Sequence, residues 1–331
     1  MKFVFIIQSH TTFLTSMGVI DYLHLKEEDV IMLYMRHYSN SVINHGFTIV
    51  DFNTAYDNYC DTLFNSRKVR KEGVRYIDRL IEQHINDFYH LFAPHYGAPL
   101  FQVIYSHPLC VDGAYVQEGG VPFSTAYIRK IPWYRRIRNF AVNRLYYRTK
   151  RIWRPSLWYA PYTLTKQKSI DSYSVSLDFF KYLPSTNHIV KWPSVNVDIN
   201  INSKYPIFIA DSYLSFGICD EDVYIDSWER LINEYSKDNN YIKFHPQQKQ
   251  EEIDMYLSFF KGKHVKVLPN DIPFELILLS KTQDKLSVLG LGSSLLFFAR
   301  DLGHNVICKD KWLLGSHKYK NYKARYGFDL F

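Results

Sequence analysis

Cysteine is scarce in this sequence, with four among 331 residues, and none of the four is arranged for metal binding. They lie far apart, with no Cys-x-x-Cys pair and no spacing typical of metal ligands. The pattern predicts reduced, mostly buried thiols in a cytoplasmic protein. The four are Cys60, Cys110, Cys219 and Cys308.

Long hydrophobic runs are also absent. Lys2 precedes an apolar run of only five residues, Phe3 to Ile7, which Gln8 interrupts. This run is too short for the core of a signal peptide, and no window approaches the ~20 apolar residues that span a bilayer. We therefore expect any membrane contact to be peripheral, on the inner face of the cytoplasmic membrane.

Acidic residues are missing from the whole segment between Gly119 and Ile170. Basic residues alternate there with aromatic ones, which is typical of segments that lie on an anionic bilayer surface. A solvated helical face is the second interpretation, and nucleic-acid binding is the third because no RNA-binding motif is present. The basic residues are Arg129, Lys130, Arg135, Arg136, Arg138, Arg144, Arg148, Lys150, Arg151, Arg154, Lys166 and Lys168, and the aromatic ones include Trp133, Tyr134, Phe140, Tyr146, Tyr147, Trp153, Trp158 and Tyr159.

The composition that remains is that of a globular protein. Hydrophobic residues make up 47% of the chain and charged residues 22%, and the length allows two domains with substantial cores. The net charge of +7 favours an anionic partner, which leaves nucleotides, phospholipid surfaces and nucleic acids open.

Strands and helices are expected to alternate along both halves of the chain. A strand at residues 3–7, a hydroxyl-rich turn and a helix to about Leu25 are typical of the start of a Rossmann-like domain, although no Gly-x-Gly-x-x-Gly follows. Further strands are predicted at residues 30–34, 47–51, 101–105, 114–117, 207–210, 241–244, 265–268, 286–289 and 306–308, and helices at 74–92, 223–235, 251–260, 273–280 and 295–302.

A polar, Asn-rich stretch at residues 191–204 reads as a linker. We therefore predict an α/β protein with domains at residues 1–195 and 205–310, followed by a basic aromatic tail at 311–331. Two successive sets of alternating strands and helices indicate two facing Rossmann-like domains with a cleft between them.

His245 is the first candidate for chemistry. It follows an apolar strand in Lys243-Phe244-His245-Pro246, and proline favours an extended residue before it, so His245 should project from the carboxyl edge of a sheet. For an isolated His-Pro a simple loop histidine is the better explanation, and the second such dipeptide, His107-Pro108, shows how common the pair is.

Two further motifs occupy similar positions. Gly290-Leu291-Gly292-Ser293-Ser294 joins a predicted strand to a helix, where backbone N–H groups and hydroxyls bind anions, although a serine there can simply cap the helix. Glu118 follows a strand and precedes two glycines, which suits a general base but also an exposed turn residue.

Other polar residues carry weaker signals. Asp220-Glu221-Asp222 has the form of a metal-bound nucleotide site, but its place before a helix favours capping. Ser9 and His10 lie on the first strand-to-helix loop and could line the cleft.

The order of these motifs resembles that of the bacterial sialyltransferases that act on lipooligosaccharide and of the capsular polysialyltransferases. The matching residues are Gln117-Glu118-Gly119 for the acidic-Gly motif, His245-Pro246 for the His-Pro motif and Ser293-Ser294 for the serine motif, with Pro273 to Leu276 between the last two. The resemblance runs from the first strand to about Cys308 and implies a GT-B fold. Gln117 departs from the pattern because the family prefers an acidic residue there. The resemblance therefore does not identify the acceptor class or the linkage.

The resemblance also implies a reaction and its residues. Sialic acid would move with inversion, and with no metal or other cofactor, from CMP-sialic acid to a galactoside or sialoside, such as a lipid-linked surface oligosaccharide. Glu118 in the acceptor-side domain would be the general base, with Gly119 beside it, and His245 in the donor domain would protonate or hydrogen-bond the departing phosphate. Further donor contacts would come from Lys243, Pro246, Glu275, Gly292, Ser293 and Ser294.

Three alternatives stay open. Another GT-B transferase that releases a cytidine nucleotide, acting on Kdo or glycerophosphate, would need the same motifs. A metal-dependent transferase would use Asp220 and Asp222. A non-catalytic basic module would bind membrane or RNA and leave His245 idle.

Overall fold

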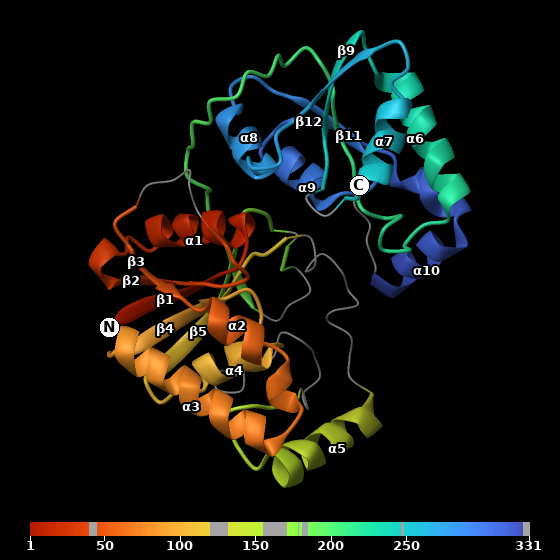
Figure 1. Cartoon of the computed structure of the whole chain (residues 1–331). Coiled ribbons are helices and arrows are strands. Elements are labelled where there is room, and N and C mark those ends of the chain that lie inside the picture. Colours follow the sequence, from red (N-terminus) through yellow and green to blue (C-terminus); the bar gives the residue numbers. More distant parts are fainter. Residues whose placement is uncertain are drawn as a thin grey trace. The chain divides into compact units, whose positions relative to one another are not determined.

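The chain folds into two units, Met1–Pro193 and Ser194–Phe331, each with its own parallel β-sheet (Figure 1). This computed structural model describes residues 1–39, 45–119, 132–154, 171–177, 179–180, 185–245 and 248–326. The boundary between the units lies inside the predicted linker. The parallel sheets confirm the α/β, GT-B class expected from the sequence, as two Rossmann-like units in succession; the cleft between them stays a prediction.

The first sheet has the strand order β3-β2-β1-β4-β5-β6-β7. The chain builds outward from β1 in one direction and then from β4 in the other, so the topological switch point lies between β1 and β4. Figure 1 shows α1 on one face of this sheet and α2, α3 and α4 on the other. The elements are β1 (Lys2–Ile7), α1 (His10–Tyr22), β2 (Val30–Tyr34), β3 (Thr48–Asp51), α2 (Asn53–Tyr59), α3 (Arg67–His84), β4 (Tyr89–Ala93), α4 (Pro99–Tyr105), β5 (Cys110–Val116), α5 (Trp133–Ala141), β6 (Asp171–Ser174) and β7 (Thr186–Ile189).

The second sheet has the order β10-β9-β8-β11-β12, with its switch point between β8 and β11. Helices α6 and α7 cover one face and α8 and α9 the other (Figure 1). The elements are β8 (Ile207–Ile209), α6 (Glu221–Tyr235), β9 (Asn239–Lys243), α7 (Gln250–Ser258), β10 (His264–Val267), α8 (Phe274–Ser280), β11 (Ser287–Gly290), α9 (Ser294–Asp301), β12 (Asn305–Cys308) and α10 (His317–Tyr326).

Central strands of both sheets are buried on both faces. All five side chains of β2 are buried, as are the last four of β1. Parallel strands covered by helices on each face are continuous apolar runs in sequence, which is why these strands were predictable. The four cysteines, all of them in the described part of the chain, form no disulfide.

The predicted helix at residues 74–92 is wrong at both ends. Helix α3 begins at Arg67 and ends at His84, because Asn86 adopts a left-handed conformation (φ 45°) that stops it. Residues Tyr89–Ala93 form β4, which pairs with β1.

The predicted strand at residues 101–105 is also wrong, since this run belongs to helix α4. Pro99 is its first residue, and all seven of its side chains are buried. A short apolar run buried on every side has no periodicity that separates a strand from a helix, so tertiary packing decided the outcome.

The predicted tail at residues 311–331 is part of the second unit as far as it is described. A short 3₁₀ helix, Asp310–Gly315, leads into α10. Leu313 and Tyr319 pack into the apolar core of the unit, so this segment is folded against the sheet and its helices.

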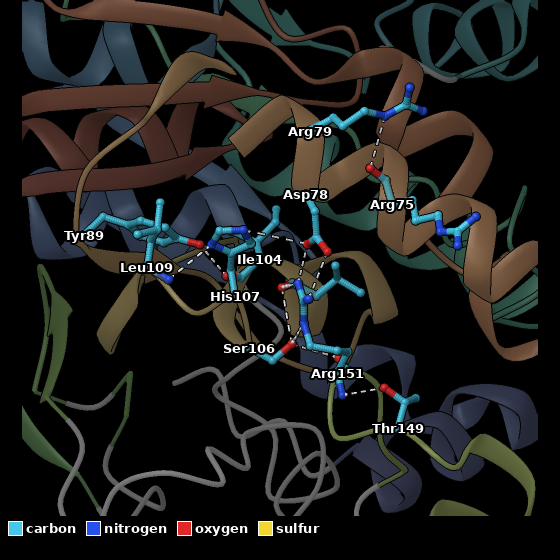
Figure 2. A network of polar contacts seen from close by, with 11 residues as sticks. Arg75, Asp78, Arg79, Tyr89, Ile104, Ser106, His107, Leu109, Thr149 and Arg151 are labelled. Atoms are coloured by element: carbon cyan, nitrogen blue, oxygen red, sulfur yellow. Dashed lines mark hydrogen bonds and ion pairs between the residues drawn. The ribbon is translucent and has the colours of Figure 1, made fainter. Parts of the chain in front are cut away.

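Helix α5 runs into a single π-helical segment, Val142–Tyr147, and the chain then returns to α3 and α4. Figure 2 shows how Arg151 fixes this return. Its guanidinium donates to both carboxylate oxygens of Asp78 on α3, at 3.0 and 2.5 Å, and to the hydroxyl oxygen of Ser106 at 2.9 Å. Arg151 therefore serves the fold, in contrast to its predicted place in an anion-binding segment.

The second His-Pro histidine, His107, belongs to the same network (Figure 2). It is buried, its Nδ1 accepts the N–H of Leu109 at 3.2 Å, and its Nε2 lies 3.9 Å from the Asp78 carboxylate. His107 is thus a structural loop histidine.

Candidate active site

In the first unit, Glu118 lies two residues beyond the end of β5, at the carboxyl edge of the sheet. Its Oε1 accepts a hydrogen bond of 2.5 Å from Nε2 of Gln8, which follows β1. Because β4 lies between β5 and β1, this contact spans the switch point, where open α/β sheets bind ligands. The Glu118 side chain is 20% exposed, and burial raises the pKa of its carboxyl.

Arg36 approaches Glu118 from a third strand. It follows β2, and its Nη1 lies 3.8 Å from the same Oε1. The Arg36 cation and the Gln8 amide each lower the pKa of Glu118, so they oppose the effect of burial.

His95, on the connection between β4 and α4, adds a neutral imidazole to this edge. Burial, with a smaller contribution from the Arg36 charge, lowers the pKa of His95 to about 4. Sequence reasoning missed Gln8, Arg36 and His95 as site residues. A usable signal existed, because each lies one or two residues beyond a strand end.

Gln117 points away from this cluster. It is fully buried, and its Oε1 accepts the N–H of Val175, beside β6, at 2.8 Å. Neighbouring residues of an extended chain face opposite ways, so Gln117 holds the sheet while Glu118 faces the edge. The departure from an acidic residue at position 117 therefore leaves Glu118 in place.

The predicted acceptor residues lie at the same edge. The Ser9 hydroxyl caps α1 by accepting the N–H of Thr12. His10 packs edge-on against Tyr38, and burial lowers its pKa to about 4, so its imidazole is neutral at pH 7. Gly119 has free space beside it among the described residues, since a Cβ there would meet none of their atoms within 4 Å.

In the second unit, His245 lies two residues beyond β9, at the carboxyl edge as predicted. Its side chain is exposed and meets the Phe216 ring edge-on, with ring centroids 6.4 Å apart. Partial burial lowers its pKa, which favours the neutral imidazole at pH 7. Pro246 lies outside the described residues.

Gln248 ties His245 to the neighbouring strand. Its Oε1 accepts the backbone N–H of His245 at 2.8 Å, and its Nε2 donates to the carbonyl of Asp211, beyond β8, at 2.8 Å. Tyr224 donates to the Asp211 carboxylate at 2.8 Å, and burial raises the pKa of that carboxyl to about 7. Sequence reasoning missed both Gln248 and Asp211, which show only as polar residues after predicted strands.

The glycine and serine turn lies between β11 and α9, beside the switch point of the second sheet. Ser293 is the N-cap of α9 and accepts the N–H of Leu295 at 3.3 Å, while Ser294 is the first helical residue. Tyr213 donates to the Gly292 carbonyl at 2.8 Å and would collide with any Cβ at that position. Glycine is therefore needed at position 292, because any side chain there would displace the Tyr213 ring.

Lys243 has a structural task that the sequence did not indicate. Its ammonium is buried and donates to the carbonyl oxygens of Pro269 and Ile272, the latter at 2.9 Å. These bonds hold the loop that begins α8, whose second residue is Glu275. Burial lowers the pKa of Lys243 to about 8, against the opposing charge of Glu275. A donor contact by Lys243 itself stays a prediction.

Asp220 caps a helix, but not the one that the sequence suggested. Its carboxylate accepts the Ser316 hydroxyl at 2.9 Å and the N–H of His317 at 2.8 Å, at the start of α10. It makes no side-chain bond to α6, which it precedes. In the described part of the chain, no cluster of His, Cys, Asp and Glu has the arrangement of a metal site.

Similar solved structures share little sequence with this chain. A sialyltransferase from Photobacterium damsela has 13% identity and a TM-score of 0.43, covering 89% of this chain and 71% of that one. E. coli heptosyltransferase WaaC with ADP has 13% identity and a TM-score of 0.40, covering 93% and 86%. S. aureus MnaA with UDP has 11% identity and a TM-score of 0.48, covering 92% and 78%. No curated protein sequence matches the chain.

A family model provides the decisive comparison. The model described as alpha-2,8-polysialyltransferase (POLYST) matches residues 114–306, which is more than half of the chain. The matched span contains Glu118, His245, Ser293 and Ser294, so the three motifs lie inside it in the expected order. The chain therefore belongs to the alpha-2,8-polysialyltransferase family and is a sialyltransferase.

Proposed function

We propose that the protein transfers sialic acid from CMP-sialic acid to a sugar hydroxyl by an inverting displacement that needs no metal. The observation that carries the proposal is the Glu118 carboxyl, held at the switch point of the first sheet and inside the span matched by the family. Burial raises the pKa of Glu118, against the opposing charge of Arg36, which makes its carboxylate a stronger base than an ordinary glutamate.

The proposed chemistry divides between the two units. Glu118 takes the proton from the acceptor hydroxyl. At the same time the oxygen of that hydroxyl bonds to the anomeric carbon of the sialic acid. The bond from that carbon to the phosphate oxygen of CMP breaks, and negative charge builds on the leaving phosphate. His245 donates a hydrogen bond or a proton there, and Ser293, Ser294 and the N-terminus of α9 hold the other oxygens.

Two assignments support donor binding. Glu275 would contact the cytidine ribose from the first turn of α8, and Lys243 holds the loop before this helix by its bonds to Pro269 and Ile272. Gly292 lets Tyr213 brace the turn that presents the two serines. The acceptor is proposed to be a sialoside or galactoside of a bacterial surface glycan, such as capsule or lipopolysaccharide, carried on a lipid.

The test is donor choice. Purified protein is incubated with CMP-sialic acid, CMP-Kdo or CDP-glycerol and a sialylated oligosaccharide acceptor, and nucleotide release is measured with and without EDTA. We expect release from CMP-sialic acid alone, unaffected by EDTA. Turnover of either other donor without turnover of CMP-sialic acid would disprove the proposal, and product linkage analysis would identify the bond formed.

We also propose that α5 docks the protein on an anionic membrane surface, not on nucleic acid. Trp133, Ile137 and Phe140 recur at helical spacing and are between 57 and 72% exposed. Arg135 and Arg138 are exposed and lie on the side of the helix opposite this apolar stripe. A helix with an apolar stripe on one side and arginines on the other fits a headgroup layer, where aromatic rings enter and arginines meet phosphates. No helix of the described residues is long and apolar enough to cross a bilayer.

The membrane proposal predicts selective loss of binding. Replacing Trp133, Ile137 and Phe140 together with serine should lower the affinity for vesicles containing phosphatidylserine at least tenfold, because three apolar side chains no longer insert. Reversing the charge at Arg135, Arg136 and Arg138 should do the same, at about 1 kcal/mol per cation or more. Vesicle flotation measures both effects.

Activity on a soluble acceptor in detergent should stay within about twofold in these variants, since α5 carries no residue of the proposed reaction. The double change Arg75→Glu and Arg79→Glu on α3 alters exposed cations elsewhere on the same unit and serves as the control. Unchanged flotation of the serine variant, or an equal loss in the control, would refute docking through α5.

A further inference from the structure

The two oxygens of the Glu118 carboxyl have different surroundings. Oε1 receives both the Gln8 amide, at 2.5 Å, and the Arg36 guanidinium, at 3.8 Å. Oε2 accepts no hydrogen bond from a described residue, and it is not fully buried, so it can be reached from outside the protein. A proton from a sugar hydroxyl therefore has one open oxygen to go to.

The backbone at Arg36 is strained. Arg36 and the next residue, His37, both have left-handed φ angles, 58° and 55°, which residues other than glycine rarely adopt. The strained turn is held by a hydrogen bond of 2.6 Å from the His37 N–H to Oδ1 of Asn53. Strain of this kind persists where surrounding structure enforces it, and here it turns the chain beyond β2 so that Arg36 reaches Glu118.

Arg36 is the cation that faces Glu118 in the described part of the chain. Three titratable groups lie around Arg36 itself: Tyr56 from α2, Cys60 at the C-cap of this helix, and His95 from the connection after β4. Burial raises the pKa of Tyr56 to about 12 and that of Cys60 to about 11, and holds His95 near 4. All three are neutral at pH 7, so none of them competes with Glu118 for the guanidinium charge.

From this geometry we propose that Arg36 is a positioning residue for the catalytic base. Together with Gln8 it fixes Oε1, keeps the carboxyl ionised and leaves Oε2 to receive the acceptor proton. The inference rests on the proposed function of Glu118 as the base. It assigns to Arg36, a residue outside the acidic-Gly, His-Pro and serine motifs, control over the pH at which that base works.

The test is the pH profile of kcat for CMP release in Arg36→Gln, Arg36→Lys and the control Arg75→Gln, which removes an exposed arginine on α3. A nearby cation lowers a carboxyl pKa, so its removal raises the pKa of Glu118. We expect the acid limb of Arg36→Gln to move up by about one pH unit, with activity on that limb falling about tenfold and the plateau at higher pH nearly restored. Arg36→Lys keeps the charge, so its acid limb should stay close to that of the wild type.

A structural role alone would lower kcat by the same factor at every pH, and that result would overturn the inference. Arg36→Gly separates strain from charge: it should match Arg36→Gln in its pH profile while its Tm equals or exceeds that of the wild type. Glu118→Gln distinguishes a failure of the proposed base from a failure of the proposed role of Arg36. If it stays active, the proposed base is wrong; if it is inactive while Arg36→Gln leaves the limb unmoved, only the role of Arg36 is wrong.

Discussion

Replacing Glu118 with glutamine is expected to lower kcat for sialyl transfer by about 10³, within the range of 10² to 10⁴ typical of a lost general base. Glutamine has nearly the same shape, and its amide oxygen can still accept the hydrogen bond from Gln8. It cannot take a proton from the acceptor hydroxyl. The loss should therefore appear in kcat, with the KM for CMP-sialic acid little changed, because the donor is assigned to the second unit.

The wild-type pH profile belongs to the same prediction. Burial raises the pKa of Glu118, and a base works only when it is deprotonated. Activity should therefore fall with decreasing pH at values above the ordinary range of a glutamate. Steady-state CMP release between pH 4.5 and 9 measures this limb.

The control for Glu118 is Glu72→Gln, which changes an exposed carboxylate on α3 in the same unit. It should retain full activity, and both variants should melt close to the wild type. A Glu118→Gln protein with more than about a tenth of wild-type kcat would show that another group takes the proton.

Replacing His245 with alanine is expected to reduce kcat by about 10² to 10³, because the leaving phosphate loses its hydrogen-bond donor. The lowered pKa of His245 means that the free enzyme carries a neutral imidazole at pH 7. A neutral ring can donate a hydrogen bond, and proton transfer becomes possible once the phosphate charge raises its pKa. His245→Asn keeps a donor and should recover at least tenfold over His245→Ala if hydrogen bonding dominates.

A donor with a better leaving group separates the two roles of His245. If proton transfer dominates, His245→Asn should be as slow as His245→Ala, and both should improve with a more acidic leaving group. His264→Ala, which removes an exposed histidine on β10, is the control. Near-normal turnover by His245→Ala would remove this residue from the mechanism and leave it, like His107, a loop histidine.

Much of the fold was predictable because its strands are buried on both faces. Val30–Tyr34 has the same bounds in sequence and structure, and the second unit alternates strands and helices as expected. The failures were local. Residues 101–105 form a fully buried helix whose apolar run has no period, and Asn86 ends α3 by a left-handed turn that the periodicity does not reveal.

The sequence by itself determined the family, the two parallel sheets and the placement of Glu118, His245 and Ser293 after strands. Strand ends are readable because apolar runs stop there, and parallel strands bring those stops to one edge. Only the tertiary structure decided which neighbours act on these residues. Gln8 and Arg36 reach Glu118 from strands more than 80 residues away in the chain, and Gln248 joins His245 to Asp211. Such contacts depend on strand order and on single left-handed residues, which periodicity in the sequence does not encode.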